Sequence, residues 1–512
     1  MALVESDERT AVDAVAQLTD CNPFLPERVE LEKKLLGDAF IPIGVVWYAE
    51  GEAGTFDPNL PQLRQRVEDL AAVLQGRLAA GVHASDAELT QYRSLIFYLL
   101  WLRYEDDWLA LIRASEATRS APKRVDCYDR FLQDVVHFLA LLPGPKPDAA
   151  HLFALGFQTR RAFYHIFRKI FGASLPAALL RARVWRSIFT RNAARYRSSL
   201  WDRMADIPTL IIGESGSGKE LVARAIALSQ YIPFDPSTRS FVANPAAGFA
   251  AVNLSALSAT LIESELFGHR RGAFTGAVED HSGWFERCGP YGAVFLDEIG
   301  ELDGAIQVKL LRVLQSREFH RLGDAEPRRF SGKLIAATNR DIGQEIDAGR
   351  FREDLYYRIC ADFIRMPTLR EQLAANPDDL RSLLTIIARR TAGEAAGQGL
   401  AEEAHAWAQA QLAGHIWRGN MRELEQCVRN ILIDGEYYPR HPEPARPDAA
   451  DELTEAIRHG TITADELLTR YCMLIYAQTR SVRETARRLG MDRRTVAARL
   501  KAAKLAVDEE EE

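Results

Sequence analysis

Three charged side chains in the middle of the chain have the types and settings that phosphate chemistry requires. Lys219 ends a glycine-rich loop, and Asp297 and Glu298 follow a run of apolar residues. The loop comes after the apolar run 210–212 and before a helical pattern, which is the strand, loop and helix order of a P-loop. Its backbone N–H groups would hold phosphates, and the lysine would reach the terminal ones. The candidate nucleotide-binding residues are Gly213, Glu214, Ser215, Gly216, Ser217, Gly218, Lys219 and Glu220.

The two carboxylates complete this candidate site. Four apolar residues, 293–296, predict a buried parallel strand, and open α/β sheets bind their ligands at the carboxyl ends of such strands. Asp297 would hold Mg²⁺, and Glu298 would orient or deprotonate the attacking water. Alone, the pattern fits a buried strand that ends on a solvated acidic turn equally well. The P-loop upstream favours the catalytic interpretation.

A stretch that folding does not require lies between these two motifs. Residues 272–277 have the sequence Gly-Ala-Phe-Thr-Gly-Ala, which places a ring and a hydroxyl between glycines that let the chain turn sharply. Because a ring at such a tip has no core to enter, we expect it to meet a partner. The candidate partner-binding residues are Gly272, Ala273, Phe274, Thr275, Gly276 and Ala277.

In this order, the P-loop, the GAFTGA loop and the acidic strand end closely resemble the AAA+ module of bacterial sigma-54-dependent transcriptional activators. Residues 334–339 are similar to the family's sensor I strand, 351–358 to its arginine-finger segment and 417–424 to its sensor II helix start. The resemblance covers residues 184–435 densely and the C-terminus more loosely. It implies ATP and Mg²⁺ as cofactors, a hexameric ring of identical subunits and sigma-54 RNA polymerase holoenzyme as the partner.

The resemblance also implies roles for single arginines. Arg352 and Arg358 would reach the nucleotide of the neighbouring subunit and stabilise charge on the transferring phosphoryl group. The alternative is two solvated surface arginines. Arg422 would contact phosphate from the lid of the same subunit.

Three polar residues are assigned around the catalytic glutamate. Asn253 matches the residue that holds this glutamate until γ-phosphate is sensed, although an Asn that ends a strand is more commonly a turn former. Thr338 and Asn339 would read the γ-phosphate, or would simply cap the region of Asp341.

The chain departs from the general patterns at three places. Glu220 stands where most P-loops carry a hydroxyl, and this glutamate is common in the activator family. Arg270 stands where the family often has glutamate, which leaves the charge balance at the base of the GAFTGA loop open. The segment 231–250 is longer than expected, and its three prolines predict a surface insertion.

Composition is compatible with a protein of several domains in the cytoplasm. The chain has 512 residues, a net charge of −7 and six scattered cysteines without C-x-x-C spacing, which argues against a zinc site or a disulfide framework. The start of the chain is unlike a signal peptide, and the longest apolar run, 95–102, is too short to span a bilayer, which needs about 20 residues. We expect no membrane partner.

Residues 1–183 predict a helical, regulatory domain whose signal the sequence does not reveal. Apolar residues recur at helical spacing, as in Phe163, Ile166, Phe167 and Ile170. The basic residues beside them, 160–161 and 168–169, are expected on a solvated helix face rather than at an anion site.

The C-terminal part predicts DNA binding. Residues 184–370 would be the α/β ATPase core, 371–438 its helical lid, 439–463 a proline-rich linker that cannot pack, and 464–506 a helix-turn-helix. Nine Lys or Arg stand against two acidic residues between 480 and 504. The segment resembles the Fis-type end of the same activators, with a basic helical hairpin as the alternative. The candidate DNA-binding residues are Arg493, Arg494, Thr495 and Arg499.

The expected protein is therefore a multidomain, cytoplasmic ATPase that binds upstream double-stranded DNA and remodels the sigma-54 polymerase complex. Two other functions stay open. The chain could be a regulator that uses the AAA+ fold only for assembly, which intact Lys219, Asp297 and Glu298 argue against. It could also remodel a partner other than sigma-54.

Overall fold

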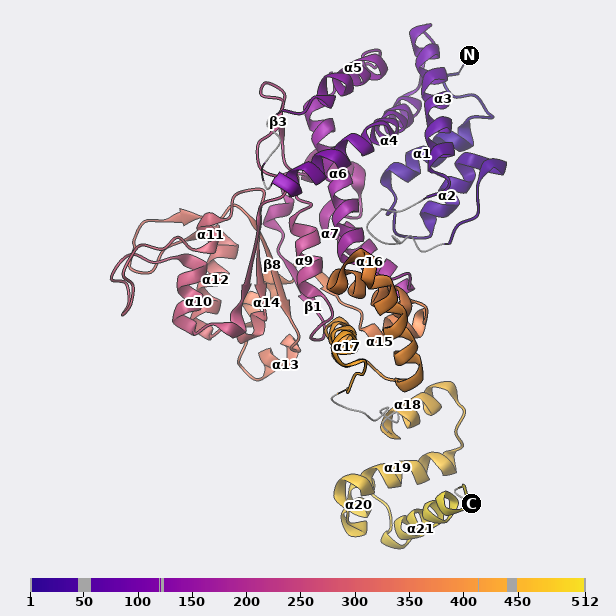
Figure 1. The fold of residues 1–512 in the computed structure, drawn as a ribbon, viewed down its shortest axis with the longest axis vertical. Coiled ribbons are helices and arrows are strands. Elements are labelled where there is room, and N and C mark those ends of the chain that lie inside the picture. Colours follow the sequence, from indigo (N-terminus) through magenta and orange to yellow (C-terminus); the bar gives the residue numbers. More distant parts are fainter. Residues whose placement is uncertain are drawn as a thin grey trace. The chain divides into compact units, whose positions relative to one another are not determined.

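The computed structural model describes residues 2–44, 57–118, 120, 124–412, 414–439 and 449–510. The chain forms two compact units (Figure 1). The first unit comprises residues 1–405 and 417–433, and the second comprises residues 406–416 and 434–512.

The described residues before the sheet are helical, as expected. Helix α4 carries the apolar run 95–102 in its buried interior, and α6 starts at a good cap, since the side chain of Asp148 accepts a hydrogen bond from the backbone N–H of His151. The helices are α1 (Arg9–Asp20), α2 (Glu27–Leu36), α3 (Leu60–Ala79), α4 (Asp86–Thr118), α5 (Cys127–Leu139), α6 (Ala149–Lys169) and α7 (Leu175–Phe189).

A five-stranded parallel sheet follows, with the strand order β4-β5-β8-β1-β9. Because all strands run the same way, the P-loop after β1, the carboxylates after β5 and the residues after β8 meet at one edge. The strands are β1 (Thr209–Ile212), β4 (Phe249–Asn253), β5 (Ala293–Asp297), β8 (Lys333–Thr338) and β9 (Asp362–Arg365).

The two faces of the sheet belong to two hydrophobic cores. Successive residues of a strand point to opposite faces, so Leu210 packs in one core and Ile211 in the other. The face of Leu210 is covered by α10 (Ala259–Phe267), α11 (Trp284–Arg287), α12 (Gly304–Ser316), α13 (Ile342–Asp347) and α14 (Glu353–Ile359), and the face of Ile211 by α9 (Lys219–Ala227) (Figure 1).

The core beneath α9 continues without a break into the N-terminal helices. Helices α6 and α7 pack on α9, and residues from Leu3 to Met366 belong to the same cluster of buried side chains. A boundary at residue 183 therefore does not coincide with a gap in the hydrophobic core.

The segment 231–250 is not the surface insertion that its prolines predicted. It forms a hairpin, β2 (Phe234–Asp235) and β3 (Ser240–Phe241), whose two phenylalanines are buried. The ring of Phe241 stacks on Phe157 of α6, with the ring centroids 4.2 Å apart. The expectation overlooked that aromatic residues within a proline-rich segment still bury apolar area when a neighbouring helix offers a face.

Arg161 of α6 also contradicts its expected place on a solvated face. Its side chain is 1% exposed, and its guanidinium donates to the backbone oxygens of Gln230 and Pro245 at 2.9 and 3.0 Å. The segment 231–250 and the residues just after α9 thus provide these carbonyls. Their hydrogen bonds offset the free-energy cost of burying this charge.

The helical lid follows β9. Helix α15 (Leu369–Ala375) starts with a capping box between Thr368 and Glu371. Helix α16 (Asp379–Gln411) is interrupted at Gly393, whose φ of +82° is outside the helical region, and α17 (Asn420–Asp434) completes the lid.

Two antiparallel strands beside the sheet, β6 (Glu318–Phe319) and β7 (Arg328–Arg329), connect α12 to β8.

The second unit contains α18 (Ala449–His459), α19 (Ala464–Thr479), α20 (Val482–Leu489) and α21 (Arg493–Glu510). Helix α18 lies within 439–463, so the expectation of an unpacked linker is wrong for this part. The last proline of the segment is Pro447, and the residues that follow form a helix with Leu453 buried, which packs on α19. The prolines at 442, 444 and 447 lie outside the described residues.

Candidate functional site

The P-loop connects β1 to α9 and closes around its own lysine. Gly216 and Gly218 have φ angles of +76° and +92°, which side chains other than glycine rarely adopt. Lys219, the first residue of α9, is 7% exposed. Its Nζ donates to the backbone oxygens of Gly213 and Glu214 at 2.9 and 3.3 Å. The loop thus holds the ammonium group and the N-terminus of α9 together, the donor set that fits a polyphosphate.

The two carboxylates lie at the end of β5, beside this lysine. Glu298 Oε1 lies 3.9 Å from Lys219 Nζ. Burial raises the pKa of Asp297, and the charge of Glu298 raises it further. A carboxylate that burial and a like charge disfavour gains most from a cation, which fits the Mg²⁺ expected with the nucleotide.

Asn339, rather than Asn253, contacts Glu298. The backbone N–H of Asn339 donates to Glu298 Oε2 at 3.2 Å. The side chain of Asn253 instead accepts from the backbone N–H and the hydroxyl of Ser255 at 3.0 and 2.8 Å. In this structure Asn253 is therefore the turn former that was the alternative, and its assignment as the holder of Glu298 is not what the structure shows.

Thr338 is buried at the end of β8 and has a structural partner. Its hydroxyl accepts from the backbone N–H of Arg340 at 3.0 Å, and its backbone oxygen accepts from Gly213 at 3.2 Å. This hydroxyl closes a turn before α13, whose own N-cap is Asp341. The hydrogen bond from the Gly213 N–H to the Thr338 backbone oxygen also fixes the end of β8 against the start of the P-loop.

The lid contacts the P-loop through at least three described residues, Asn420, Met421 and Arg422, and sequence reasoning assigned only Arg422; the N–H of Met421 donates to the Gly216 oxygen at 3.1 Å. Arg422 of α17 donates to the hydroxyl of Ser215 at 3.0 Å, next to the expected phosphates. Asn420 was missed. Its Nδ2 donates to Glu214 Oε2 at 3.0 Å and to the Ser215 oxygen at 3.1 Å, and its Oδ1 accepts from the Leu369 N–H at 2.8 Å.

The signal for Asn420 was present in the sequence. It stands after a glycine in the segment 417–424, and Asn is among the residues that tolerate the left-handed region, where Asn420 has a φ of +52°. The pattern indicated a turn. It could not show that the amide would bridge the lid and the P-loop, because the bridge joins residues some 200 positions apart.

Arg352 and Arg358 lie on α14 or at its start, with exposed side chains. Arg352 pairs with Asp354 at 2.6 Å, and Arg358 donates to the backbone oxygen of Leu314 of α12 at 3.0 Å. These partners belong to α14 and α12 rather than to the P-loop of the same chain.

The GAFTGA loop connects α10 and α11 and is closed by its own backbone. Gly272 N–H donates to the Ala277 oxygen at 2.9 Å, and Ala277 N–H donates to the Phe274 oxygen at 3.0 Å. The Phe274 ring is half-buried, edge-on to the His269 ring with centroids 4.9 Å apart. The Phe274 ring thus lies against His269 at the surface, and Thr275 is exposed.

The base of this loop is held by the arginine that departs from the family pattern. Arg270 forms ion pairs with Asp280 at 2.9 Å and with Asp324 at 3.0 Å, and lies 3.9 Å from Glu326. The residues around it are acidic, so an arginine is well matched to this position. We call these four residues the loop-base ion pairs.

The second unit has the expected helix-turn-helix. Ser481 caps α20, Gly490 turns the chain with a φ of +64°, and Asp492 Oδ1 accepts from the N–H of Arg494 at 2.8 Å. The side chains of Arg493, Arg494 and Thr495 are exposed at the start of α21.

Arg499 was expected at the DNA, and the structure places it against α19. Its guanidinium donates to the Thr469 hydroxyl at 2.8 Å and to Asp465 Oδ1 at 2.7 Å. Arg499 lies fewer than two helical turns beyond Arg493, and its contacts place it on the face of α21 that packs on α19 rather than at the N-terminal end of the helix.

Comparison with known proteins agrees with this geometry. The family described as the sigma-54 interaction domain matches residues 191–365. The chain is 44% identical over 227 residues to the Nif-specific regulatory protein of Azotobacter vinelandii, covering 44% of this chain and 40% of that protein. It is 38% identical over 310 residues to the transcriptional regulatory protein ZraR of Klebsiella oxytoca, covering 58% and 63%.

A third relative is the sigma54-dependent transcriptional activator SfnR of Pseudomonas putida. The identity is 42% over 229 residues, which cover 45% of this chain and 57% of that protein. The matched part of the chain thus spans about 40–63% of the length of these three relatives.

The parallel sheet, the P-loop with its acidic strand end and the helical lid have the layout of the AAA+ class of P-loop proteins. Within this layout, residues 191–365 match the family described as the sigma-54 interaction domain. In the described part of the chain, no group of three or more His, Cys, Asp or Glu could hold a metal ion by itself, and no helix is long and apolar enough to cross a membrane.

Proposed function

We propose that this protein hydrolyses ATP in a ring of identical subunits and uses the GAFTGA loop to remodel the sigma-54 RNA polymerase complex at promoters. The observation that carries the proposal is the combination, in one sigma-54 interaction domain, of a P-loop site with an exposed Thr275 on the loop after α10. ATP hydrolysis at the P-loop site would drive a movement of the GAFTGA loop, and the loop would transmit this movement to the polymerase complex.

The residues at the sheet edge have separable tasks in this proposal. The P-loop N–H groups and Lys219 would bind the phosphates, and Glu298 would orient the attacking water. Mg²⁺, when bound, would neutralise charge on the phosphates, and Asp297 would hold it. The N–H of Asn339 contacts Glu298, which supports a link between the sensor strand and the catalytic carboxylate.

Two arginines support hydrolysis between subunits. Arg352 and Arg358 are exposed, and their partners lie on α14 and α12. Both side chains could therefore contact the nucleotide of a neighbouring copy without breaking any contact of their own P-loop. We infer that a dispersed subunit hydrolyses ATP slowly and that assembly, hexameric by the resemblance, accelerates hydrolysis.

The second unit would place the ring on upstream double-stranded DNA. Arg493, Arg494 and Thr495 are free to enter a major groove at the N-terminal end of α21. Their position at a capped helix start is the geometry that helix-turn-helix proteins use for base edges.

The test is Thr275→Ala in the full chain. We expect ATP hydrolysis near the wild-type rate and no open-complex formation by sigma-54 polymerase on supercoiled DNA, because the hydroxyl lies outside the nucleotide site. Lys219→Ala serves as the control that should abolish both readouts.

Binding of sigma-54 in the presence of a transition-state nucleotide analogue separates the alternatives. Wild-type protein should retain sigma-54, and Thr275→Ala should not. Normal activation by Thr275→Ala would contradict the role of the loop. Hydrolysis without sigma-54 retention would point to another partner.

A further inference from the structure

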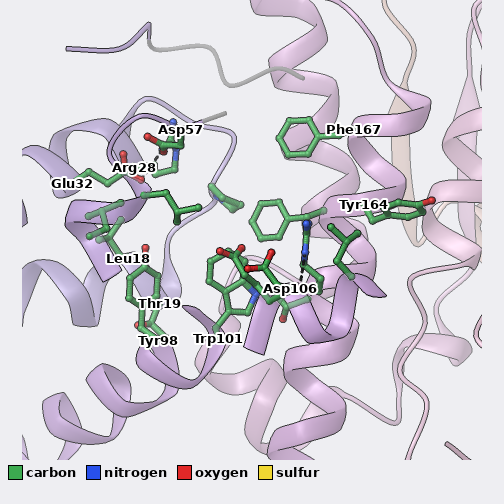
Figure 2. A pocket seen from close by; sticks show the side chains of 18 of the residues that line it. Leu18, Thr19, Arg28, Glu32, Asp57, Tyr98, Trp101, Asp106, Tyr164 and Phe167 are labelled. Atoms are coloured by element: carbon green, nitrogen blue, oxygen red, sulfur yellow. Dashed lines mark hydrogen bonds and ion pairs between the residues drawn. The ribbon is translucent and has the colours of Figure 1, made fainter. Parts of the chain in front are cut away.

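A cavity of about 310 Å³ lies among the N-terminal helices, lined by residues of α1 to α4 and α6 (Figure 2). This volume is at the lower end of the range of small-molecule sites, which starts at about 300 Å³. Of the described residues that line it, none belongs to the nucleotide site or to the GAFTGA loop.

Aromatic rings form much of its wall. Trp101 of α4 faces Phe163 of α6, with ring centroids 5.6 Å apart, and Phe163 stacks nearly parallel on Phe167 with an interplanar angle of 14°. Tyr98 stacks on Trp101 at 6.3 Å. Flat faces of this kind favour a planar occupant, because ring stacking adds to the burial of apolar area.

Glu32 and Trp101, both in the wall, each have a buried polar atom without a hydrogen bond among the described residues. One oxygen of Glu32 pairs with Arg28 at 2.6 Å, but the other, Oε2, is buried without a hydrogen bond, and Glu32 as a whole is 3% exposed. The indole Nε1 of Trp101 is also buried without an acceptor. Nearly all buried polar groups in proteins are satisfied, so an acceptor and a donor left open in one cavity indicate a ligand that supplies both.

The charges around the cavity are balanced. The described lining residues include four carboxylates and four guanidinium groups, which are Glu32, Asp57, Glu105 and Asp106, and Arg28, Arg113, Arg160 and Arg168. Figure 2 shows Arg28, Glu32 and Asp57 together on one side, and Tyr164 and Phe167 on the helix opposite. An uncharged ligand disturbs this balance least, since an added buried charge would lack a counter-ion.

We propose that this cavity binds an uncharged, planar aromatic or heteroaromatic molecule of one or two rings that carries a hydrogen-bond donor and an acceptor. The donor bonds to Glu32, and the acceptor receives the indole N–H of Trp101. Burial raises the pKa of Glu32 to about 7, so both protonation states of its carboxyl group are populated near neutral pH. A neutral ligand can hydrogen-bond to either state.

The position of the cavity connects it to the nucleotide site through one helix. Helix α6 contributes Phe163 and Phe167 to the cavity, and it packs on α9, which begins with Lys219. Gln158 of α6 donates to the backbone oxygen of Ser229, just beyond the end of α9. A molecule in the cavity thus lies against the same helix that supports the P-loop helix.

The experiment uses 2-naphthamide as the probe and the full-length protein, with binding followed by saturation-transfer NMR and calorimetry. Three probes of matched size serve as comparisons: 2-naphthoate, 2-naphthylmethylamine and the saturated decalin carboxamide. We expect 2-naphthamide to bind one site per chain and to bind more tightly than all three.

Trp101→Phe keeps the ring and removes the N–H, so it should weaken naphthamide binding roughly three- to tenfold, the effect of one hydrogen bond. Trp108→Phe is the matched control, because Trp108 is another α4 tryptophan with a buried Nε1 that lacks an acceptor among the described residues, but it does not line the cavity. Failure of every probe to bind, tighter binding of a charged probe, or equal weakening by both substitutions would overturn the proposal.

Discussion

At the scale of single residues, the nucleotide site is held by short polar contacts between parts of the chain far apart in sequence. Lys219 is positioned by carbonyls of its own loop, and Glu298 by the N–H of Asn339. Asn420 is the most connected of these residues, since its amide contacts the P-loop twice and the start of the lid once.

Replacement of Asn420 by glycine tests this bridge. Glycine tolerates the positive φ, so the variant loses the amide contacts alone, and we expect the free energy of unfolding to fall by about 1–3 kcal/mol. The affinity for a fluorescent ATP analogue should fall as well, because the P-loop loses two of its hydrogen bonds to the lid. Thermal denaturation and nucleotide titration measure both effects.

Asn420→Ala is the second variant at this site. It should lose more stability than the glycine variant, because alanine is also strained at a left-handed φ. If Asn420→Gly were as stable as wild type while Asn420→Ala were not, the residue would matter only for its backbone, and the bridge would be unimportant.

At the scale of elements, the GAFTGA loop is anchored by the loop-base ion pairs. Arg270, before the loop, pairs with Asp280, after the loop, and with Asp324 in a neighbouring turn. The ion pairs thus join both ends of the loop to that turn. The backbone N–H of Arg271 at Asp280 and that of Glu326 at Asp324, together with the Arg270 guanidinium, hold the pKa of both carboxyl groups below the usual range.

Arg270→Gln should therefore loosen the loop without affecting the nucleotide site. We expect faster hydrogen exchange at the amides of Gly272 and Ala277, with ATP affinity unchanged. Arg271→Gln is the matched control, because the neighbouring side chain is exposed and only its backbone N–H contacts Asp280. Equal exchange in the two variants would show that the ion pairs do not hold the loop.

The helix-turn-helix makes a separate prediction for two arginines of one helix. Arg494→Ala should weaken DNA binding and reduce its salt dependence, while leaving the thermal midpoint of the second unit unchanged. Arg499→Ala should lower that midpoint, because Arg499 ties α21 to Asp465 and Thr469 of α19. The reverse outcome would place Arg499 at the DNA, as the sequence first indicated.

At the scale of the whole molecule, the N-terminal helices and the ATPase core share one hydrophobic core. The hairpin 234–241 stacks on α6, and Arg161 is buried between α6 and the same segment. Regulation by these helices would therefore act through packing at α6 and α9 rather than through a loosely tethered domain.

Removal of residues 1–180 should accordingly damage the core. The face of α9 and the hairpin would lose their cover, so we expect aggregation or a lowered thermal midpoint and increased binding of a hydrophobic dye. Removal of residues 434–512 is the control, since they belong to the second unit, and the remaining protein should keep its fold and its ATP affinity. A soluble, cooperatively unfolding protein without residues 1–180 would contradict this.

The sequence by itself determined the class of site and the local devices that build it. The P-loop, the acidic strand end and the GAFTGA loop were all readable, because each depends on residues close together in the chain. The all-helical character of the N-terminal part was readable for the same reason, from its period of apolar residues.

Only the tertiary structure decided which distant residues meet. It replaced Asn253 with Asn339 at Glu298, brought Asn420 to the P-loop and moved Arg499 from the DNA to α19. It also buried Arg161 and the proline-rich hairpin that composition had placed in solvent. Hydrogen bonds and apolar burial between distant segments depend on which faces the fold brings together. The residues near each position in the sequence do not determine these contacts.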